Sequence, residues 1–297
     1  MLSSISASQK RSSFRKQLAA GKLLLLPGAF SPLVALEAQK QGFDGIYASG
    51  AVIAADLALP DIGLTTLSEV AARSEQIARV VDLPTLVDID TGFGGPMNAA
   101  RTVRMLEEKG LAGCHLEDQV NPKRCGHLDN KRVVSVEEMV VRVKAAVAAR
   151  LDSNFVICAR TDARAVEGLD AAIARARAYV DAGADMIFPE ALVDEREFAA
   201  FRRAIDVPLL ANMTEFGKSE LLDTATLSTL GFNVVIFPVT SLRLAMAAVR
   251  EGFEEIAASG TQRSLVHRMQ TRQQLYELLK YSDYETFETG IWNITGR

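Results

Sequence analysis

Eight short apolar runs alternate with helical patterns along this chain, and this alternation restricts its fold more than any other feature. Most of the runs are continuously apolar, which is typical of parallel strands covered on both faces. The predicted strands are Leu23–Pro27, Gly45–Ser49, Thr85–Asp90, Gly113–Asp118, Phe155–Asp162, Asp185–Glu190, Pro208–Met213 and Asn233–Pro238. Eight such units predict an α/β fold of the (β/α)8 TIM-barrel type. An open doubly wound sheet is the alternative, although no GxGxxG motif follows the first strand.

Several helix boundaries between the runs are marked. Thr66 with Glu69, and Ser135 with Glu138, predict capping boxes at two helix starts. Four glycines precede strands by a few residues and can end the preceding helix in the left-handed conformation. They are Gly42, Gly110, Gly183 and Gly231.

We expect one domain over residues 1–297, made of an N-terminal helix or extension (1–22), the barrel (23–259) and a C-terminal helical segment and tail (260–297). Leu265–Lys280 is predicted to be helical, and Tyr281–Arg297 to be a tail that packs on a neighbour or stays loose. A chain of 297 residues can remove about 75% of its unfolded surface from water without covalent links. Three cysteines, an odd number, indicate a reduced protein, which we expect in the cytoplasm.

The first 21 residues are rich in serine and carry Lys10, Arg11, Arg15 and Lys16. We interpret them as a surface helix over Ser13–Ala20; a transit peptide to the mitochondrial matrix is the alternative. The net charge of −4 argues against a nucleic-acid partner. The apolar runs are too short to span a bilayer, so no membrane partner is expected.

Polar residues gather where the predicted strands end, which in a barrel is where catalysis takes place. Unless such groups converge on a ligand or a metal, burying them is costly. They are Tyr47, Ser49, Gly50, Asp88, Asp90, His115, Glu117, Asp118, Arg160, Asp162, Glu190, Asn212 and Thr214, with Arg243 after the last strand.

Asp88 and Asp90 are two residues apart on one strand, so both side chains are expected on the same face. Oxygen ligands with room for water suit Mg²⁺ better than Zn²⁺. The alternative is that this Asp-x-Asp only caps the next turn.

Cys125 follows the fourth strand in the polar segment NPKRCGHLDNK. Its neighbours Lys123, Arg124 and His127 are expected to lower its pKa and to suit it to proton transfer or nucleophilic attack on a mobile lid. An idle loop thiol is one alternative. A zinc site formed by Cys114, His115, Cys125 and His127 is another.

Two absences narrow the substrate. No lysine ends a predicted strand, which argues against Schiff-base chemistry. The loops after the last two strands, TEFGKS and VTSLR, lack a glycine-rich phosphate cradle. Since Arg160 and Arg243 match carboxylates, we expect a small polycarboxylate substrate.

Several segments resemble the isocitrate lyase and phosphoenolpyruvate mutase superfamily. The segments are VDIDTGFG at 87–94, LEDQ at 116–119, KRCGH at 123–127, ARTDA at 159–163, FPEA at 188–191 and NMTEFG at 212–217. The similarity runs from about Phe14 to Tyr284. KRCGH, FPEA and MQTRQQLYE are most similar to the 2-methylisocitrate lyase branch, because isocitrate lyases usually carry KKCGH and are longer.

The resemblance implies a Mg²⁺-dependent barrel, with Mn²⁺ as a possible substitute, that splits 2-methylisocitrate into pyruvate and succinate in the methylcitrate route of propionate breakdown. It also implies a homotetramer with exchanged C-terminal helices. Asp88 and Asp90 would carry the metal, Ser49, Gly50 and Ala51 would hold the keto-acid half, and Asp61 falls on a functional position. The segment SGAV is one residue shorter than the glycine-rich version in some relatives, so the resemblance does not fix the detailed contacts of Ala51. The residues implied for the substrate carboxylates are Gly126, Arg160, Glu190, Asn212, Thr214, Arg243 and Arg272.

For the chemistry, we expect Tyr47, as tyrosinate, to be the base. Arg160, Asn212 and Thr214 would neutralise the carbanion, and Cys125 would protonate it. Glu117 and His127 complete the expected catalytic set. Isocitrate cleavage and oxaloacetate hydrolysis are alternative activities, since one methyl group is worth only about 1 to 3 kcal/mol of discrimination. An inactive barrel that serves as a binding module is the non-enzymatic alternative.

Overall fold

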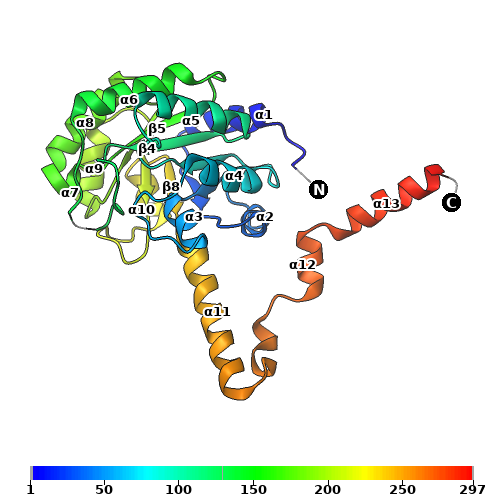
Figure 1. The fold of residues 1–297 in the computed structure, drawn as a ribbon. Helices are drawn as coiled ribbons and strands as arrows, with labels where there is room; N and C mark the ends of the chain where they lie inside the picture. The colour runs from blue at the N-terminus through cyan, green and yellow to red at the C-terminus, as the bar shows by residue number, and fades with distance from the viewer. Residues whose placement is uncertain (1–2, 129, 296–297) are drawn as a thin grey trace.

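The structure, a computed structural model that describes residues 3–128 and 130–295, contains the eight predicted strands in one barrel (Figure 1). Each strand pairs in parallel with its neighbours. The strands are β1 (Leu24–Pro27), β2 (Ile46–Ala48), β3 (Thr85–Asp88), β4 (Gly113–Glu117), β5 (Val156–Thr161), β6 (Met186–Pro189), β7 (Leu210–Asn212) and β8 (Val234–Phe237).

The strands form a closed ring rather than an open sheet. One set of paired strands has the order β1-β8-β7 and the other the order β2-β3-β4-β5-β6. Parallel bridges from Gly28 to Tyr47 and from Ile187 to Leu209 join the two sets at both seams. The (β/α)8 barrel is therefore confirmed, and the doubly wound alternative is wrong. Each strand is shorter than predicted at one or both ends. β3, for example, ends at Asp88, and the chain turns at Asp90, which has a φ of 49°.

Helices follow the strands around the outside of the barrel. They are α1 (Ala7–Ala19), α2 (Pro32–Lys40), α3 (Gly50–Asp56), α4 (Leu67–Ala78), α5 (Pro96–Glu108), α6 (Val136–Ala149), α7 (Arg164–Glu167), α8 (Leu169–Asp181), α9 (Glu195–Ala204) and α10 (Thr224–Thr229). The capping box of Thr66 and Glu69 is confirmed at the start of α4. At the start of α6, Ser135 caps the backbone of Glu138, but the Glu138 carboxylate pairs with Arg142 instead of completing the box. The four helix-ending glycines all have positive φ, as predicted.

Three buried apolar clusters hold the barrel together, the smallest of them between α2, β2 and α4. Inside the ring, inward-facing residues such as Leu26, Leu86 and Val234 pack into one cluster that Phe14 and Leu18 of α1 join. A larger cluster lies between the strands and the outer helices. Because α1 fills one end of the interior, the polar ends of the strands are left at the other.

Two of the four basic residues of α1, Lys10 and Arg11, are buried and bind backbone carbonyls of other elements. Lys10 donates from Nζ to the carbonyl of Ala78, at 2.8 Å, where α4 ends. Arg11 donates to the carbonyls of Leu111, at 2.9 Å, and of Glu107, where α5 ends. The N-terminal helix is therefore longer than predicted, and two of its basic residues are buried caps on other helices.

We expect Arg11→Met to destabilise the folded protein by about 2 to 4 kcal/mol, because two buried carbonyls lose their donor and Asp152 loses an ion pair. Lys16→Met, on the exposed side of the same helix, is the matched control and should change stability by less than about 0.5 kcal/mol. Urea unfolding of the two variants measures the difference. Equal stabilities would contradict the assigned role of Arg11.

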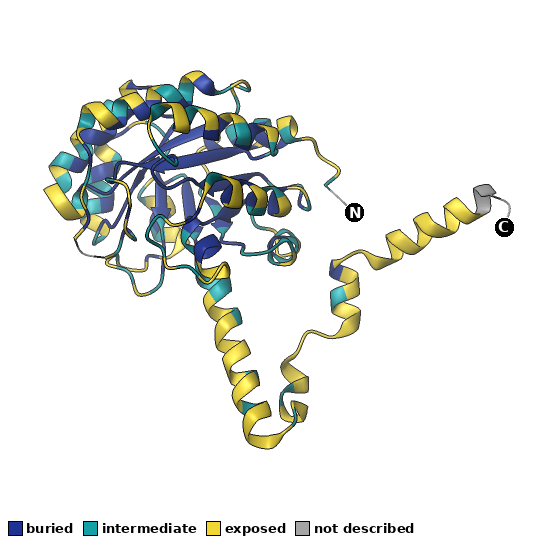
Figure 2. Ribbon diagram, viewed as in Figure 1, coloured by how far each residue is buried: buried dark blue, intermediate teal, exposed yellow. Residues whose placement is uncertain are grey.

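After β8 the chain leaves the barrel. α11 (Thr240–Ser259) extends outward, and η1 (Arg263–Arg268), α12 (Arg272–Leu278) and α13 (Tyr281–Thr295) follow it (Figure 1). Figure 2 shows this arm to be mostly exposed, and α11 buries none of its residues. It nevertheless carries large apolar side chains, including Leu244, Met246 and Phe253.

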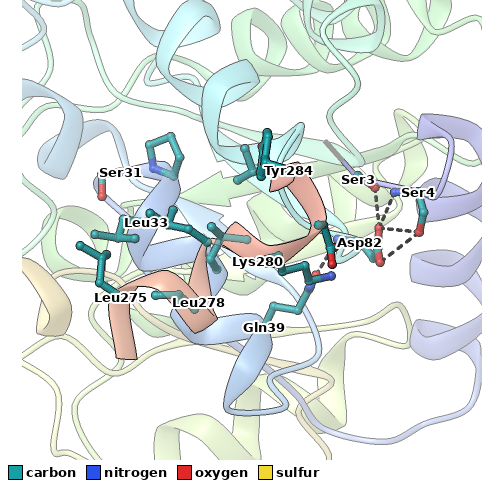
Figure 3. Close-up of a pocket in the computed structure, with 15 residues that line it drawn as sticks. Ser3, Ser4, Ser31, Leu33, Gln39, Asp82, Leu275, Leu278, Lys280 and Tyr284 are labelled. Atoms are coloured by element: carbon teal, nitrogen blue, oxygen red, sulfur yellow. Dashed lines mark hydrogen bonds between the residues drawn. The ribbon is translucent and has the colours of Figure 1, made fainter. Parts of the chain in front are cut away.

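The segment predicted to be a loose or neighbour-bound tail is helical in α13 up to Thr295. Its first turn and α12 lie along α2, and Figure 3 shows Leu275 and Leu278 there, near Leu33. The boundary proposed at 259–260 coincides with the end of α11, while the division into three parts stays a prediction. Among the described residues, no helix is long and apolar enough to cross a membrane.

Candidate active site

The carboxyl ends of the strands enclose a cavity of about 60 Å³. Its lining contains most of the predicted site residues: Tyr47, Ser49, Ala51, Asp61, Asp88, Cys125, Gly126, His127, Arg160, Glu190, Asn212 and Thr214. That volume holds only a few water molecules, since each takes about 30 Å³ in the liquid. Cys125, Gly126 and His127 of the loop after β4 form part of the cavity wall.

Asp88 and Asp90 face the same small space beside Gly50. A Cβ atom on Gly50 would lie 3.0 Å from Asp88 Oδ2 and 3.2 Å from Asp90 Oδ1. Asp88 accepts hydrogen bonds from the backbone of Gly50, at 3.1 Å, and of Asp90, at 3.0 Å. The hydrogen bond from the backbone of Asp90 to Asp88 is the contact that the turn-capping alternative describes. Both carboxylates reach the same space because the backbone turns into the left-handed conformation at Asp90, as well as because side chains alternate along the strand.

Two buried carboxylates here are only partly satisfied. Oδ1 of Asp90 contacts Lys123 at 2.9 Å and Oε2 of Glu117 contacts Arg160 at 3.3 Å, while Oε1 of Glu117 lacks a hydrogen-bond partner. Burial raises the pKa of Asp90 to about 6 and that of Glu117 well above its usual value. Buried carboxylate oxygens of this kind fit a hard divalent cation that keeps part of its water shell. Among the described residues no ready cluster of three ligands exists, so water and substrate would have to complete the shell.

Lys123 is a site residue that the sequence analysis did not select. It pairs with Asp61, and its Nζ lies 2.9 Å from Asp90 Oδ1. Burial alone would lower the pKa of Lys123, but the carboxylates of Glu117, Asp90 and Asp61 outweigh it and raise the pKa well above its usual value. The first letter of KRCGH was its only signal, since it lies on a loop and not at a strand end.

The predicted pKa shift of Cys125 is wrong in direction. Burial raises the pKa of this thiol. The two neighbouring cations do not offset this effect, since the Lys123 ammonium pairs with a carboxylate and the Arg124 side chain is exposed. Cys125 thus keeps its proton, which suits an acid better than a nucleophile. The zinc alternative is also wrong within the described residues, where no such cluster forms and Cys114 is packed in the apolar core.

Tyr47 is held by His115 inside the barrel. Its hydroxyl lies 2.8 Å from Nε2 of His115. Burial, followed by the charge of Asp88, raises the pKa of Tyr47 well above its usual value. Burial also lowers the pKa of His115 to about 4, so this ring is neutral at pH 7. The expected tyrosinate is therefore not the resting form of the described site.

Arg160 lies at the centre of a carboxylate cluster. It donates to both oxygens of Asp162, at 2.9 and 3.1 Å, and its other contacts are Glu190 at 3.2 Å and Glu117 at 3.3 Å. Burial would raise the pKa of Glu190, but Arg160 more than offsets this effect and lowers it. The guanidinium is thus fixed in place by bidentate pairing.

His127 connects this cluster to the loop after β7. Its Nε2 lies 3.0 Å from Glu190 Oε1, and its Nδ1 accepts the backbone N–H of Lys218 at 2.9 Å. An accepting Nδ1 places the ring proton of neutral His127 on Nε2, where it donates to Glu190. Asn212 lies beside both, with Nδ2 3.3 Å from Glu190 Oε2.

Comparison with known proteins identifies the family. Residues 14–257 match the family model described as phosphoenolpyruvate phosphomutase. The chain belongs to this family.

Relatives in this family have closely similar sequences. A probable 2-methylisocitrate lyase 2 of Corynebacterium glutamicum is 61% identical over 98% of this chain and 94% of its own length. The 2-methylisocitrate lyase of Bacillus subtilis is 49% identical over 94% of this chain and 92% of its own.

Solved structures of family relatives have the same fold. Oxaloacetate acetylhydrolase with the inhibitor 3,3-difluorooxalacetate has a TM-score of 0.90 and 35% identity, covering 97% of this chain and 98% of its own. Phosphonopyruvate hydrolase with oxalate and Mg²⁺ has a TM-score of 0.86 and 32% identity, covering 94% and 98%. The superfamily is generally Mg²⁺-dependent, and both ligands named here are small carboxylates.

Five predicted residues of this family member are not among those that line the cavity. They are Gly50, Asp90 and Glu117, whose contacts with Asp88 and Arg160 are described above, and Arg243 and Arg272. Arg243, at the start of α11, is at the rim, where it stacks over Phe216 at 4.9 Å and lies 3.6 Å from Glu215. Arg272 is on α12 beside Tyr276 and Tyr281. The structure does not bring it to the cavity of its own chain, because α11 extends outward and α12 then lies along α2, on the outside of the barrel (Figure 1).

Proposed function

We propose that this chain is a Mg²⁺-dependent carbon–carbon lyase that cleaves 2-methylisocitrate into pyruvate and succinate. The observation that carries this proposal is the cavity itself, where the buried Asp88 carboxylate, the fixed Arg160 guanidinium and the protonated thiol of Cys125 line one small space. The names of the relatives at 61% and 49% identity support the substrate. That substrate belongs to the methylcitrate route of propionate breakdown.

The metal would be held by Asp88 and Asp90, directly or through water, with Mn²⁺ as a possible substitute. When bound, Mg²⁺ supplies Lewis acidity toward the oxygen that becomes a carbonyl. Ser49, Gly50 and Ala51 would hold the keto-acid half at the start of α3. The other carboxylates would bind at the groups on the opposite wall, which are Gly126, Arg160, Glu190, Asn212 and Thr214.

The cleavage needs one proton removed and one delivered. A base takes the proton of the tertiary hydroxyl, its oxygen becomes the carbonyl of pyruvate, and the adjacent C–C bond breaks. The bonding pair moves to the carbon that becomes part of succinate. There Arg160, Asn212 and Thr214 would stabilise the negative charge, and the Cys125 thiol would donate the proton.

Tyr47 remains our candidate base, with Glu117 and Asp61 in supporting roles. Its raised pKa means that the phenol must lose its proton within the loaded site before it can accept another. His115 Nε2, at 2.8 Å, accepts the hydrogen bond of the phenol when Nδ1 carries the ring hydrogen, and so holds the Tyr47 oxygen in place. His127 would orient Glu190 through the hydrogen bond described above.

We also propose that the chain assembles as a homotetramer in the cytoplasm, with exchanged C-terminal helices. The apolar side chains that α11 leaves exposed support such an exchange, because a large apolar patch usually marks an interface. In that arrangement Arg272 would act, if at all, in the site of a neighbouring chain.

The decisive experiment follows pyruvate and succinate formation from racemic 2-methylisocitrate. We expect turnover with Mg²⁺, loss of turnover in EDTA and its return with added Mg²⁺ or Mn²⁺. Isocitrate and oxaloacetate are assayed in parallel. We expect both to react more slowly, isocitrate by at least about ten-fold, as the loss of one methyl contact allows. A faster reaction with either would reassign the substrate, and no reaction with any of the three would indicate a binding module.

A further inference from the structure

The loop that carries Cys125, Gly126 and His127 forms part of the wall of the cavity, so its position sets where the thiol lies relative to a bound substrate. A group that holds this loop in place therefore decides where the thiol lies. The candidates for such a group are the buried charged side chains that the chemistry above leaves unused. Lys131 is one of them, with its side chain only 2% exposed.

Gly126 is the point where the loop touches the site. A Cβ atom here would lie 2.3 Å from Arg160 Nη2 and 2.6 Å from Glu190 Cγ. The loop backbone therefore rests directly on these two side chains, at a distance that only glycine allows. Because Gly126 follows Cys125 in the chain, the place of its peptide group largely fixes the place of the thiol.

Lys131 holds the other side of that peptide group. Its ammonium donates to the carbonyl of Gly126 and, at 3.1 Å, to Oδ1 of Asp162. Both carboxylate oxygens of Asp162 accept hydrogen bonds from Arg160. The contacts close a ring in which Lys131 bridges the loop to the carboxylate that fixes the guanidinium under it.

We propose that Lys131 is a positioning residue that latches the Cys125 loop onto the Arg160–Asp162 pair. The Asp162 carboxylate then binds both Lys131 and Arg160, so the position of the loop and the position of the Arg160 guanidinium are fixed together. The latch acts through Gly126 and Asp162 and touches neither the substrate nor the reacting atoms. Its effect on turnover rests on the proposed function, whereas its effect on the loop does not.

The test measures loop position without substrate. Cys114 and Cys158 are fully buried, so iodoacetamide should label the folded protein at Cys125 alone, as mass spectrometry can verify. We expect Lys131→Met to speed this labelling at least about ten-fold. Removing a positive charge cannot itself increase the thiolate fraction, so faster labelling reports exposure of the thiol. Lys144→Met, on the exposed side of α6, should label at the unmodified rate.

Turnover and a conservative variant complete the design. With 2-methylisocitrate, Lys131→Met should lower kcat by about 10- to 100-fold, with a smaller change in KM, because the thiol is misplaced rather than removed. Lys131→Gln keeps an N–H donor for the Gly126 carbonyl and should fall between the wild type and the methionine variant in labelling and in kcat. If Lys131→Met unfolds and exposes Cys114 and Cys158, Lys131→Gln alone provides the test. Labelling of Cys125 within two-fold of the wild type in the folded variants would overturn the proposal, whatever their activity.

Discussion

Cys125→Ser should lower turnover of 2-methylisocitrate by about 10³-fold while leaving the fold and the binding of products intact. The reason is proton donation: a positioned general acid contributes about 10² to 10⁴ to the rate, and a hydroxyl is a much weaker acid than a thiol. Serine is close to cysteine in size and occupies the same half-buried place, so the cavity changes little. Steady-state kinetics measure the loss.

Product binding separates the acid role from a structural one. Calorimetry with succinate and Mg²⁺ should give Cys125→Ser a Kd within about three-fold of the wild type. Arg124→Gln changes the exposed neighbour of Cys125 and is the matched control, with kcat within about three-fold. A Cys125→Ser enzyme with full activity would exclude the thiol as the acid.

The pH profile checks the same assignment. Burial raises the pKa of Cys125 above its ordinary value of 9.0. An acid works below its pKa, so the fall in kcat caused by loss of this proton should come only above about pH 9. The lowered pKa expected from the sequence would place that fall near neutral pH instead.

The fold was predictable because its signal is local and repeated. A continuously apolar run such as Val234–Phe237 identifies a buried strand wherever it occurs, and the glycine that precedes it marks the end of a helix. Eight repeats then leave few topologies. That α11 extends away from the barrel was not predictable in this way. Its apolar side chains have the spacing of a helix packed on the barrel, although they are exposed in the structure.

The residues of the site were easier to predict than their electrostatics. Polar strand ends identified Arg160 and Glu190, since closure of the ring brings these ends together. The pKa of Cys125 depends instead on where its neighbours point. Lys123 is adjacent in sequence yet turns to Asp61 and Asp90. Lys131 and its bridge depend on how a loop folds back, for which strand patterns carry no signal.

Asp90→Asn should reduce turnover by about 10³-fold and weaken Mg²⁺ binding, because it removes one of the two charges proposed to hold the ion. A bound metal contributes several kcal/mol of charge stabilisation, and each 1.36 kcal/mol is ten-fold in rate. Asparagine is almost the same size and tolerates the left-handed φ of 49° at this position, so the turn should persist. Titration with Mn²⁺, followed by electron paramagnetic resonance, measures the affinity.

The same substitution should have the opposite effect on the stability of the metal-free protein. The pKa of Asp90 is raised to about 6 in the folded protein by burial, so its ionised form is disfavoured by folding and the penalty grows as pH rises through 6. In EDTA at pH 8, Asp90→Asn should therefore melt at a higher temperature than the wild type, while Asp181→Asn, at the exposed end of α8, should leave both stability and activity unchanged. A fully active Asp90→Asn enzyme would show that this carboxylate is not needed to hold the cation. An Asp90→Asn enzyme that melts at a lower temperature than the wild type in EDTA would show that the carboxylate stabilises the barrel through Lys123.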